Sequence, residues 1–91
     1  GLKFSKIVYI LSENNNEIAR RILEEMGRGA TALKARGMYT GEEKEMLFCV
    51  LGHREEPQIK DIIYEIDPRA FVIVSNANEV TGEGFLENYR E

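Results

Sequence analysis

Few side chains in this sequence belong to the types that carry most enzyme chemistry. His53 is the sole histidine and Cys49 the sole cysteine. A zinc site needs several ligands and an acid–base histidine needs a partner, yet no second histidine and no CxxC pair is present. Cys49 also lies within an apolar run, where a thiol packs as a small hydrophobic group. We therefore predict a protein that is not an enzyme and holds no metal and no cofactor; the alternative is an enzyme acting through His53 and nearby Glu55.

A glycine-bearing segment in the middle of the chain is a better candidate for binding. Gly37 and Gly41 flank Tyr39 and Thr40, and Lys44 follows shortly. Exposed backbone N–H groups, a ring that can stack and a cation together suit a small anionic or nucleotide-like ligand. The alternative is a tight hairpin plugged by the tyrosine, because the phosphate-loop spacing GxxxxGK[ST] is absent.

A second candidate binding segment lies near the C-terminus. It consists of Gly82, Glu83, Gly84 and Phe85. These residues either contribute to a ligand site or only shape a turn that lets Phe85 contact the core.

Length and composition bound the class of protein. The chain has 91 residues, of which 43% are hydrophobic and 31% charged, so we predict one small domain over residues 1–91. The formal net charge of −4 disfavours nucleic acid as a partner. No run approaches the roughly 20 apolar residues that span a bilayer, and we expect a soluble piece. Because the chain starts at Gly1, we also expect that it was excised from a longer protein or processed.

The pattern of apolar residues predicts the order strand, helix, strand, strand, helix, strand. Asn14 with Glu17 resembles a capping box at the start of the first helix, and Gly27 and Gly29 suit the positive φ that ends it. The predicted strands cover residues 4–11, 30–39, 46–51 and 70–75, and the helices run to about Met26 and from Glu56 to Ile66. This order is the ferredoxin-like βαββαβ fold, an α+β sandwich with the first and third strands at the centre of a four-stranded antiparallel sheet.

Three of the predicted strands are apolar on both faces. Val8 and Ile10 in the first and Val72 and Val74 in the last are examples. Two helices cover only one face of such a sheet, and large exposed apolar patches are rare in monomers. We therefore predict a homo-oligomer, a dimer or a trimer, or a partner domain packed on the open face. The core spans about residues 4–75, and the tail 76–91 is either docked or a short helix.

Several motifs in this order look like the C-terminal domain of YitT-type bacterial membrane proteins. They are Arg28-Gly29-Ala30-Thr31, Gly37-Met38-Tyr39-Thr40-Gly41, Cys49-Val50, Ile66-Asp67-Pro68, Ala70–Ser75, Glu79-Val80 and Gly82–Phe85. The resemblance covers about Val8 to Phe85. It implies a domain on the cytoplasmic face of the inner membrane, with a fold similar to that of the nitrogen-regulatory PII proteins, which commonly are trimers that bind small anionic effectors between subunits.

The function that this resemblance implies is a regulatory sensor domain of a membrane protein. Its partners would be other copies of itself, the transmembrane region of the parent protein and a small anionic ligand. In this interpretation Arg28 and Lys44 neutralise the anion, Tyr39 stacks on it, and Gly41 and the Gly82–Gly84 turn present backbone amides. The alternative is a purely structural oligomerisation module that binds no ligand.

Overall fold

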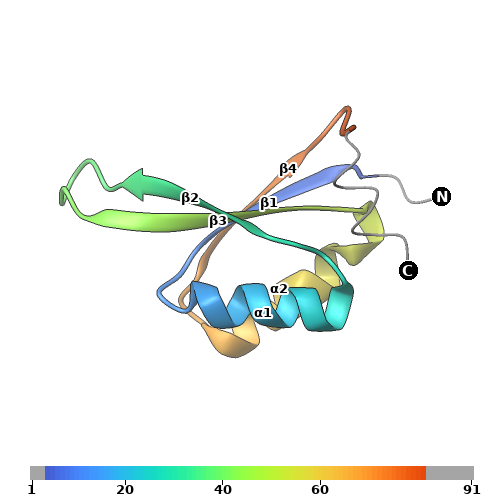
Figure 1. Ribbon diagram of the computed structural model, residues 1–91, viewed down its shortest axis with the longest axis horizontal. Coiled ribbons are helices and arrows are strands. Elements are labelled where there is room, and N and C mark those ends of the chain that lie inside the picture. Colours follow the sequence, from blue (N-terminus) through green and yellow to red (C-terminus); the bar gives the residue numbers. More distant parts are fainter. Residues whose placement is uncertain (1–3, 82–91) are drawn as a thin grey trace.

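The computed structural model describes residues 4–81, which form a four-stranded antiparallel sheet with two helices on one face (Figure 1). The elements in chain order are β1 (Lys6–Leu11), α1 (Asn15–Met26), β2 (Thr31–Arg36), β3 (Glu43–Leu51), the short 3₁₀ helix η1 (His53–Glu55), α2 (Glu56–Ile66) and β4 (Phe71–Asn76). The sheet order is β2-β3-β1-β4. The predicted ferredoxin-like fold, with the first and third strands at the centre, is confirmed.

Helix α1 ends as predicted and begins differently. Gly27 adopts φ 67° and its N–H donates to Leu23 O at 3.0 Å, the left-handed ending that glycine favours. Gly29 does not share this conformation. The predicted capping box is wrong, because Asn14 has φ −109° and ψ 35°, outside the extended conformation that aims a cap side chain at the first turn. Instead, Ser12 Oγ accepts a hydrogen bond from Asn14 N at 2.9 Å.

Helix α2 lies beside α1 and buries its isoleucines. Ile59, Ile62 and Ile63 are buried, and Pro57 occupies the first turn, where its missing N–H needs no partner. Arg21 Nη1 of α1 contacts Glu65 Oε1 of α2 at 2.6 Å, which links the two helices on their exposed side.

The face of the sheet toward the helices holds the core. Val8 and Ile10 of β1 are fully buried there, and the antiparallel register places Val74 and Val72 of β4 beside them. All four valine and isoleucine side chains therefore face the helices, and none of them belongs to the second face, which they were expected to help form.

The other face of the sheet is apolar and is not covered by either helix (Figure 1). Because directly opposed residues of antiparallel strands share a face, the register defines two rows across it. The first row is Leu33, Met46, Leu11 and Phe71, and the second includes Phe48, Tyr9 and Ile73. We call these seven residues the open face. The prediction of a second apolar face is thus correct, with different residues from those first used to argue it.

The hairpin of β2 and β3 extends past the helices (Figure 1). β2 ends at Arg36, before the predicted limit at residue 39, and β3 begins at Glu43, before the predicted Met46. The loop between them is closed by Gly37 N donating to Glu42 O and Gly41 N donating to Gly37 O, both at 2.8 Å. Gly41 has φ 76°, so the loop needs a glycine there.

Candidate functional site

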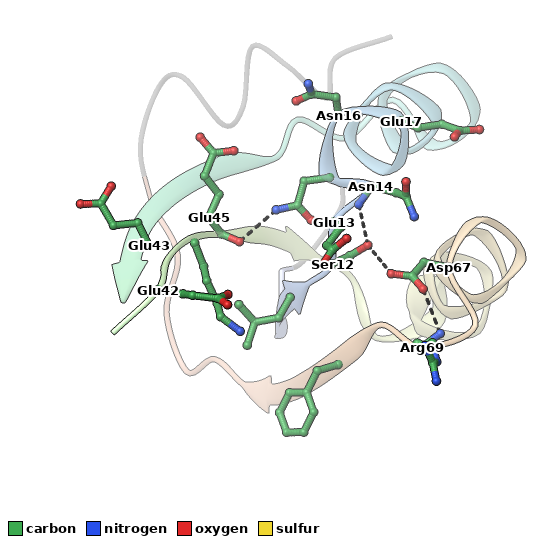
Figure 2. Close-up of a pocket in the computed structure, with 14 residues that line it drawn as sticks. Ser12, Glu13, Asn14, Asn16, Glu17, Glu42, Glu43, Glu45, Asp67 and Arg69 are labelled. Atoms are coloured by element: carbon green, nitrogen blue, oxygen red, sulfur yellow. Dashed lines mark hydrogen bonds between the residues drawn. The ribbon is translucent and has the colours of Figure 1, made fainter. Parts of the chain in front are cut away.

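A groove of about 1010 Å³ lies at the end of the sheet where β1 stops and α1 begins. The start of β3 and the connection from α2 to β4 complete its walls, as Figure 2 shows. Its lining residues are Leu11, Ser12, Glu13, Asn14, Asn15, Asn16, Glu17, Glu42, Glu43, Lys44, Glu45, Asp67, Arg69 and Phe71. These residues come from segments far apart in the sequence, so only folding assembles the groove.

The turns that border the groove are joined by Asp67. Ser12 Oγ donates a hydrogen bond to Asp67 Oδ2, and Arg69 N donates to Asp67 Oδ1 at 2.9 Å (Figure 2). The Ser12 hydroxyl and then the Arg69 amide stabilise the charged carboxylate and hold the pKa of Asp67 below its ordinary value. Asp67 therefore anchors the β1–α1 turn to the α2–β4 turn.

Asn15, the first residue of α1, is the one buried neutral polar side chain among the described residues. It is 6% exposed, and its Nδ2 donates to the backbone oxygen of Glu45 at 3.0 Å. Its Oδ1 is covered and has no hydrogen-bond partner. Leaving a buried acceptor unpaired costs about 1–3 kcal/mol, so native proteins rarely do so without a reason.

The charged groups around the groove are mainly acidic. Six of the lining residues are Asp or Glu, and Lys44 and Arg69 are the two cations (Figure 2). The register places Lys34 opposite Glu45 and Arg36 opposite Glu43, so two of the carboxylates have a cation across the strand pair. The local charge favours a ligand with positive charge over a simple anion.

The structure separates Arg28 from the other predicted site residues. Arg28 follows the C-terminal end of α1, about 18 Å along the helix from the groove at 1.5 Å per residue. It is 3% exposed, its Nε lies 3.0 Å from Glu55 Oε2, and its guanidinium lies 5.3 Å from the centre of the Phe4 ring. Glu55 Oε1 also accepts from Gly52 N at 2.8 Å. Within one copy of the chain, Arg28 and Lys44 therefore do not lie together, because Arg28 pairs with Glu55 at the opposite end of the fold.

The predicted residues of the hairpin loop lie together, away from Arg28. Tyr39 at the tip is fully exposed, and Thr40 Oγ1 accepts from Glu42 N at 3.2 Å. Gly37 has little room beside it, since a Cβ there would lie 3.1 Å from Thr40 Oγ1. Among the described members of the predicted set, only Lys44 lines the groove. Gly82, Glu83, Gly84 and Phe85 lie outside the described residues.

Sequence reasoning missed most of the groove. The run Ser12-Glu13-Asn14-Asn15-Asn16 was interpreted only as the end of a strand and a helix cap. Its density of polar residues at a strand-to-helix turn was the available signal. Nothing local indicated that Asn15 would turn inward to Glu45 or that Asp67 would join Ser12.

Neither residue that first suggested catalysis has a reactive setting. His53 is exposed in η1. Cys49 is buried, its Sγ donates to Gly29 O at 3.5 Å, and burial raises the pKa of its thiol to about 12. Within residues 4–81, no cluster of three or more His, Cys, Asp or Glu side chains is arranged to hold a metal ion.

Comparison with known proteins identifies relatives along most of the chain. The family described as "Uncharacterized protein conserved in bacteria (DUF2179)" matches residues 28–82. An "Uncharacterized protein in cccA 5'region" of Bacillus sp. (strain PS3) is 47% identical over 85 residues, covering 93% of this chain and 57% of the relative.

Two further relatives of Bacillus subtilis (strain 168) are described as UPF0750 membrane proteins. YxkD is 42% identical over 87 residues, covering 96% of this chain and 31% of its own length. YitT is 33% identical over 73 residues, covering 80% of this chain and 26% of its own length. The chain thus spans between a quarter and somewhat over half of these relatives. Within residues 4–81, neither helix is long and apolar enough to cross a membrane.

Solved structures agree with the fold. The DUF2179 protein from Eubacterium ventriosum is 38% identical, with a TM-score of 0.70, covering 78% of this chain and 97% of that chain. A protein described as PII-like from Thermus thermophilus is 18% identical, with a TM-score of 0.62, covering 90% of this chain and 94% of that chain, and this likeness shows the fold alone. The YitT resemblance and the PII-like fold are both confirmed, and this chain belongs to the DUF2179 family.

Proposed function

We propose that this chain is a non-enzymatic regulatory module of a bacterial membrane protein. It associates with other copies of itself through the open face of its sheet, and a small ligand in the adjacent groove changes that association. The observation that carries the proposal is the apolar surface formed by one row of residues across all four strands and a second row across β3, β1 and β4.

The open face has the properties of a buried surface. Phe71 is 61% exposed, Leu33 43% and Ile73 42%, although all three are large apolar side chains. Tyr9 and Phe48 lie beside one another at the centre, with ring centroids 6.4 Å apart. Monomeric proteins rarely leave so contiguous an apolar patch in water, because covering it is favourable.

A second copy of this chain is the occupant that the charges favour. The nearest charge on this face of the sheet is Lys44, which lies at the β2–β3 end, one row beyond Leu33 and Met46. In a symmetric dimer the same patch meets itself, so an apolar patch is covered by an apolar patch. The net charge of −4 opposes association in general, so an apolar contact has to supply the favourable free energy, and the open face is the surface that offers one.

The groove and the open face share residues. Leu11 and Phe71 are partners in the β1–β4 pairing, belong to the open face and also line the groove. A ligand and a second copy would therefore contact the same two side chains. Regulation requires the ligand to prefer one arrangement of subunits over another, and this shared contact supplies a physical route for such a preference.

The relatives support attachment to a membrane protein. The chain spans 31% of YxkD and 26% of YitT, so the rest of such a protein would carry the membrane-embedded part. The free thiol of Cys49 agrees with a reducing compartment, and we place the module on the cytoplasmic face of the inner membrane.

The charges of the groove favour a different ligand from the small anion that the sequence predicts. Arg28 is paired with Glu55, and Lys44 lies among Glu42, Glu43 and Glu45. A ligand of opposite charge is therefore better supported. The alternative, a purely structural module, differs in one measurement: its melting temperature would not respond to any groove ligand, whereas ligand binding stabilises a regulatory module by mass action.

The association is tested by light scattering on the purified 91-residue chain at about 100 µM, a concentration at which weak self-association is populated. We expect a mass above that of the 10.4 kDa monomer. Phe71→Lys should shift the mass to the monomer, because it places a charge within an apolar interface. Leu23→Lys is the matched control, since Leu23 is a 58% exposed apolar residue on α1, away from the open face.

Two results would contradict this assignment. If the wild-type chain is monomeric under these conditions, the open face is not a self-association interface. A Phe71→Lys variant that keeps the wild-type mass, with a folded circular dichroism spectrum, places the interface elsewhere.

A further inference from the structure

The groove contains an acceptor that is paired with no described residue. Asn15 lines the groove, is 6% exposed, and has a covered Oδ1 without a hydrogen-bond partner. The backbone oxygen of Glu45 determines which way the side-chain amide of Asn15 is turned. Nδ2 lies 3.0 Å from the backbone oxygen of Glu45, and because that oxygen can only accept, the nitrogen of the amide must face it. The atom left over is therefore an oxygen, and it needs a donor.

The acidic side chains around the groove indicate that a ligand that donates to Asn15 Oδ1 should carry a positive charge. Glu13 and Glu17, on either side of Asn15 in the sequence, are exposed and form no ion pair with any residue in 4–81. Asp67 also lines the groove, but its oxygens are used by Ser12 and Arg69. Glu42, Glu43 and Glu45 line the groove, are exposed and form no ion pair within residues 4–81 either. Five carboxylates of the rim are thus available to a ligand.

A protonated amine fits this set of groups better than a metal ion. Its N–H groups can donate to an amide oxygen and to carboxylates at once, and hydrogen bonds between charged partners are the stronger ones. A metal ion would need several converging ligands, and the described residues hold no such cluster.

We propose that the groove binds a protonated amine, which donates one N–H to Asn15 Oδ1 while the glutamates of the rim hold its charge. This rests on the proposed function, in that the groove is taken as the ligand site. Oδ1 is covered, so binding would require a local rearrangement that uncovers it. The amine can belong to a diamine or to an amino acid; in the second case Arg69 and the first N–H groups of α1 would face its carboxylate.

The test is an amide-resolved NMR titration of the 91-residue chain. The amine probes are cadaverine and lysine, and inorganic phosphate and Mg²⁺ serve as the anion and metal probes. We expect an amine to produce saturable shifts at the Asn15 side-chain amide and at the backbone of residues 12–17. Asn15→Ala should weaken binding by about tenfold or more, the loss expected for one hydrogen bond to a charged group.

Two further variants make the test specific. Gln58→Ala removes an amide from the first turn of α2, outside the groove, and should leave binding unchanged. The double variant Glu13→Gln/Glu17→Gln changes only exposed side chains, so it should fold even if Asn15→Ala does not. It should weaken amine binding by several-fold, with the difference disappearing at high salt.

The outcomes distinguish a diamine from an amino acid as the ligand, and they distinguish amine binding from self-association. Saturation by cadaverine alone identifies a diamine, and saturation by lysine alone identifies an amino acid; either result supports the inference. No saturable shift with either amine, or saturation at these residues only by phosphate or Mg²⁺, overturns it. Self-association is measured separately by light scattering, so its presence without amine binding would leave the proposed interface standing and reject the ligand.

Discussion

Asp67 shows at the scale of one residue how the groove is held together. It accepts a hydrogen bond from Ser12 of the β1–α1 turn and one from the backbone of Arg69 in the α2–β4 turn. Both bonds favour the charged carboxylate and lower the pKa of Asp67 below its ordinary value of 3.8. The unfolded chain offers neither bond, so protonation is linked to stability.

A carboxylate with a lowered pKa in the folded state stabilises the fold above its ordinary pKa. That contribution is lost as the pH falls through 3.8 and down through the lower folded-state pKa. We expect the urea midpoint of the wild type to fall more steeply than that of Asp67→Asn between neutral pH and about pH 3. Glu25 and Glu56 also have lowered pKa values and are shared by both proteins, so the difference isolates Asp67. Parallel pH profiles would contradict the linkage.

The two ends of helix α1 have different roles: the N-terminal end positions Asn15 at the groove, and the C-terminal end directs the chain into β2. Its N-terminal end turns Asn15 into the groove, and its C-terminal end stops at Gly27 with φ 67°. A Cβ added at Gly27 would meet no atom within 4 Å, so any penalty for a larger residue comes from the backbone alone. The direction of the chain from α1 into β2 depends on this left-handed residue.

Replacing Gly27 therefore tests backbone conformation without a packing change. We expect Gly27→Ala to lower the free energy of unfolding by about 1–2 kcal/mol, because an L-residue with a Cβ is strained at this φ. Gly27→Asn should lose less, since asparagine adopts the left-handed region more readily. Urea denaturation of the three proteins measures both values. Equal stability of the alanine variant and the wild type would rule out the strain.

The whole molecule is organised by the unequal faces of its sheet. One face packs Val8 and Ile10 against Ile18 and Ile22, which are all fully buried. The other presents the open face, where Phe71 and Ile73 on the edge strand β4 remain exposed. If a second copy covers this face, folding and association are linked and stability depends on concentration.

Thermal melting measures this linkage. We expect the melting temperature of the wild type to rise by several degrees between about 5 and about 200 µM, as mass action favours a folded oligomer. Ile73→Lys should melt at a temperature that does not depend on concentration. A wild-type melting temperature that stays constant over this range would contradict a folded oligomer, and a rise of the same size in Ile73→Lys would place the interface away from β4.

Much of the fold could be predicted from local patterns. Ile18 and Ile22 lie one turn apart on α1, and Ile59, Ile62 and Ile63 mark the buried side of α2, so helical spacing alone identifies both core-facing stripes. The strand order followed from connection rules that hold for most proteins. The boundaries of β2 and β3 were less accurate, because the loop at Gly41 depends on hydrogen bonds across the hairpin.

The candidate site was decided by contacts between distant segments. Arg28 pairs with Glu55, Asn15 with Glu45, and Ser12 with Asp67, across separations of 27, 30 and 55 residues. The sequence by itself determined the elements, their order and the presence of a second apolar face, because these depend on local periodicity and composition. Only the tertiary structure decided that Arg28 is an internal ion-pair partner and that the groove is acidic with an unpaired oxygen. Side-chain pairing over such separations depends on how the elements pack, which no local pattern encodes.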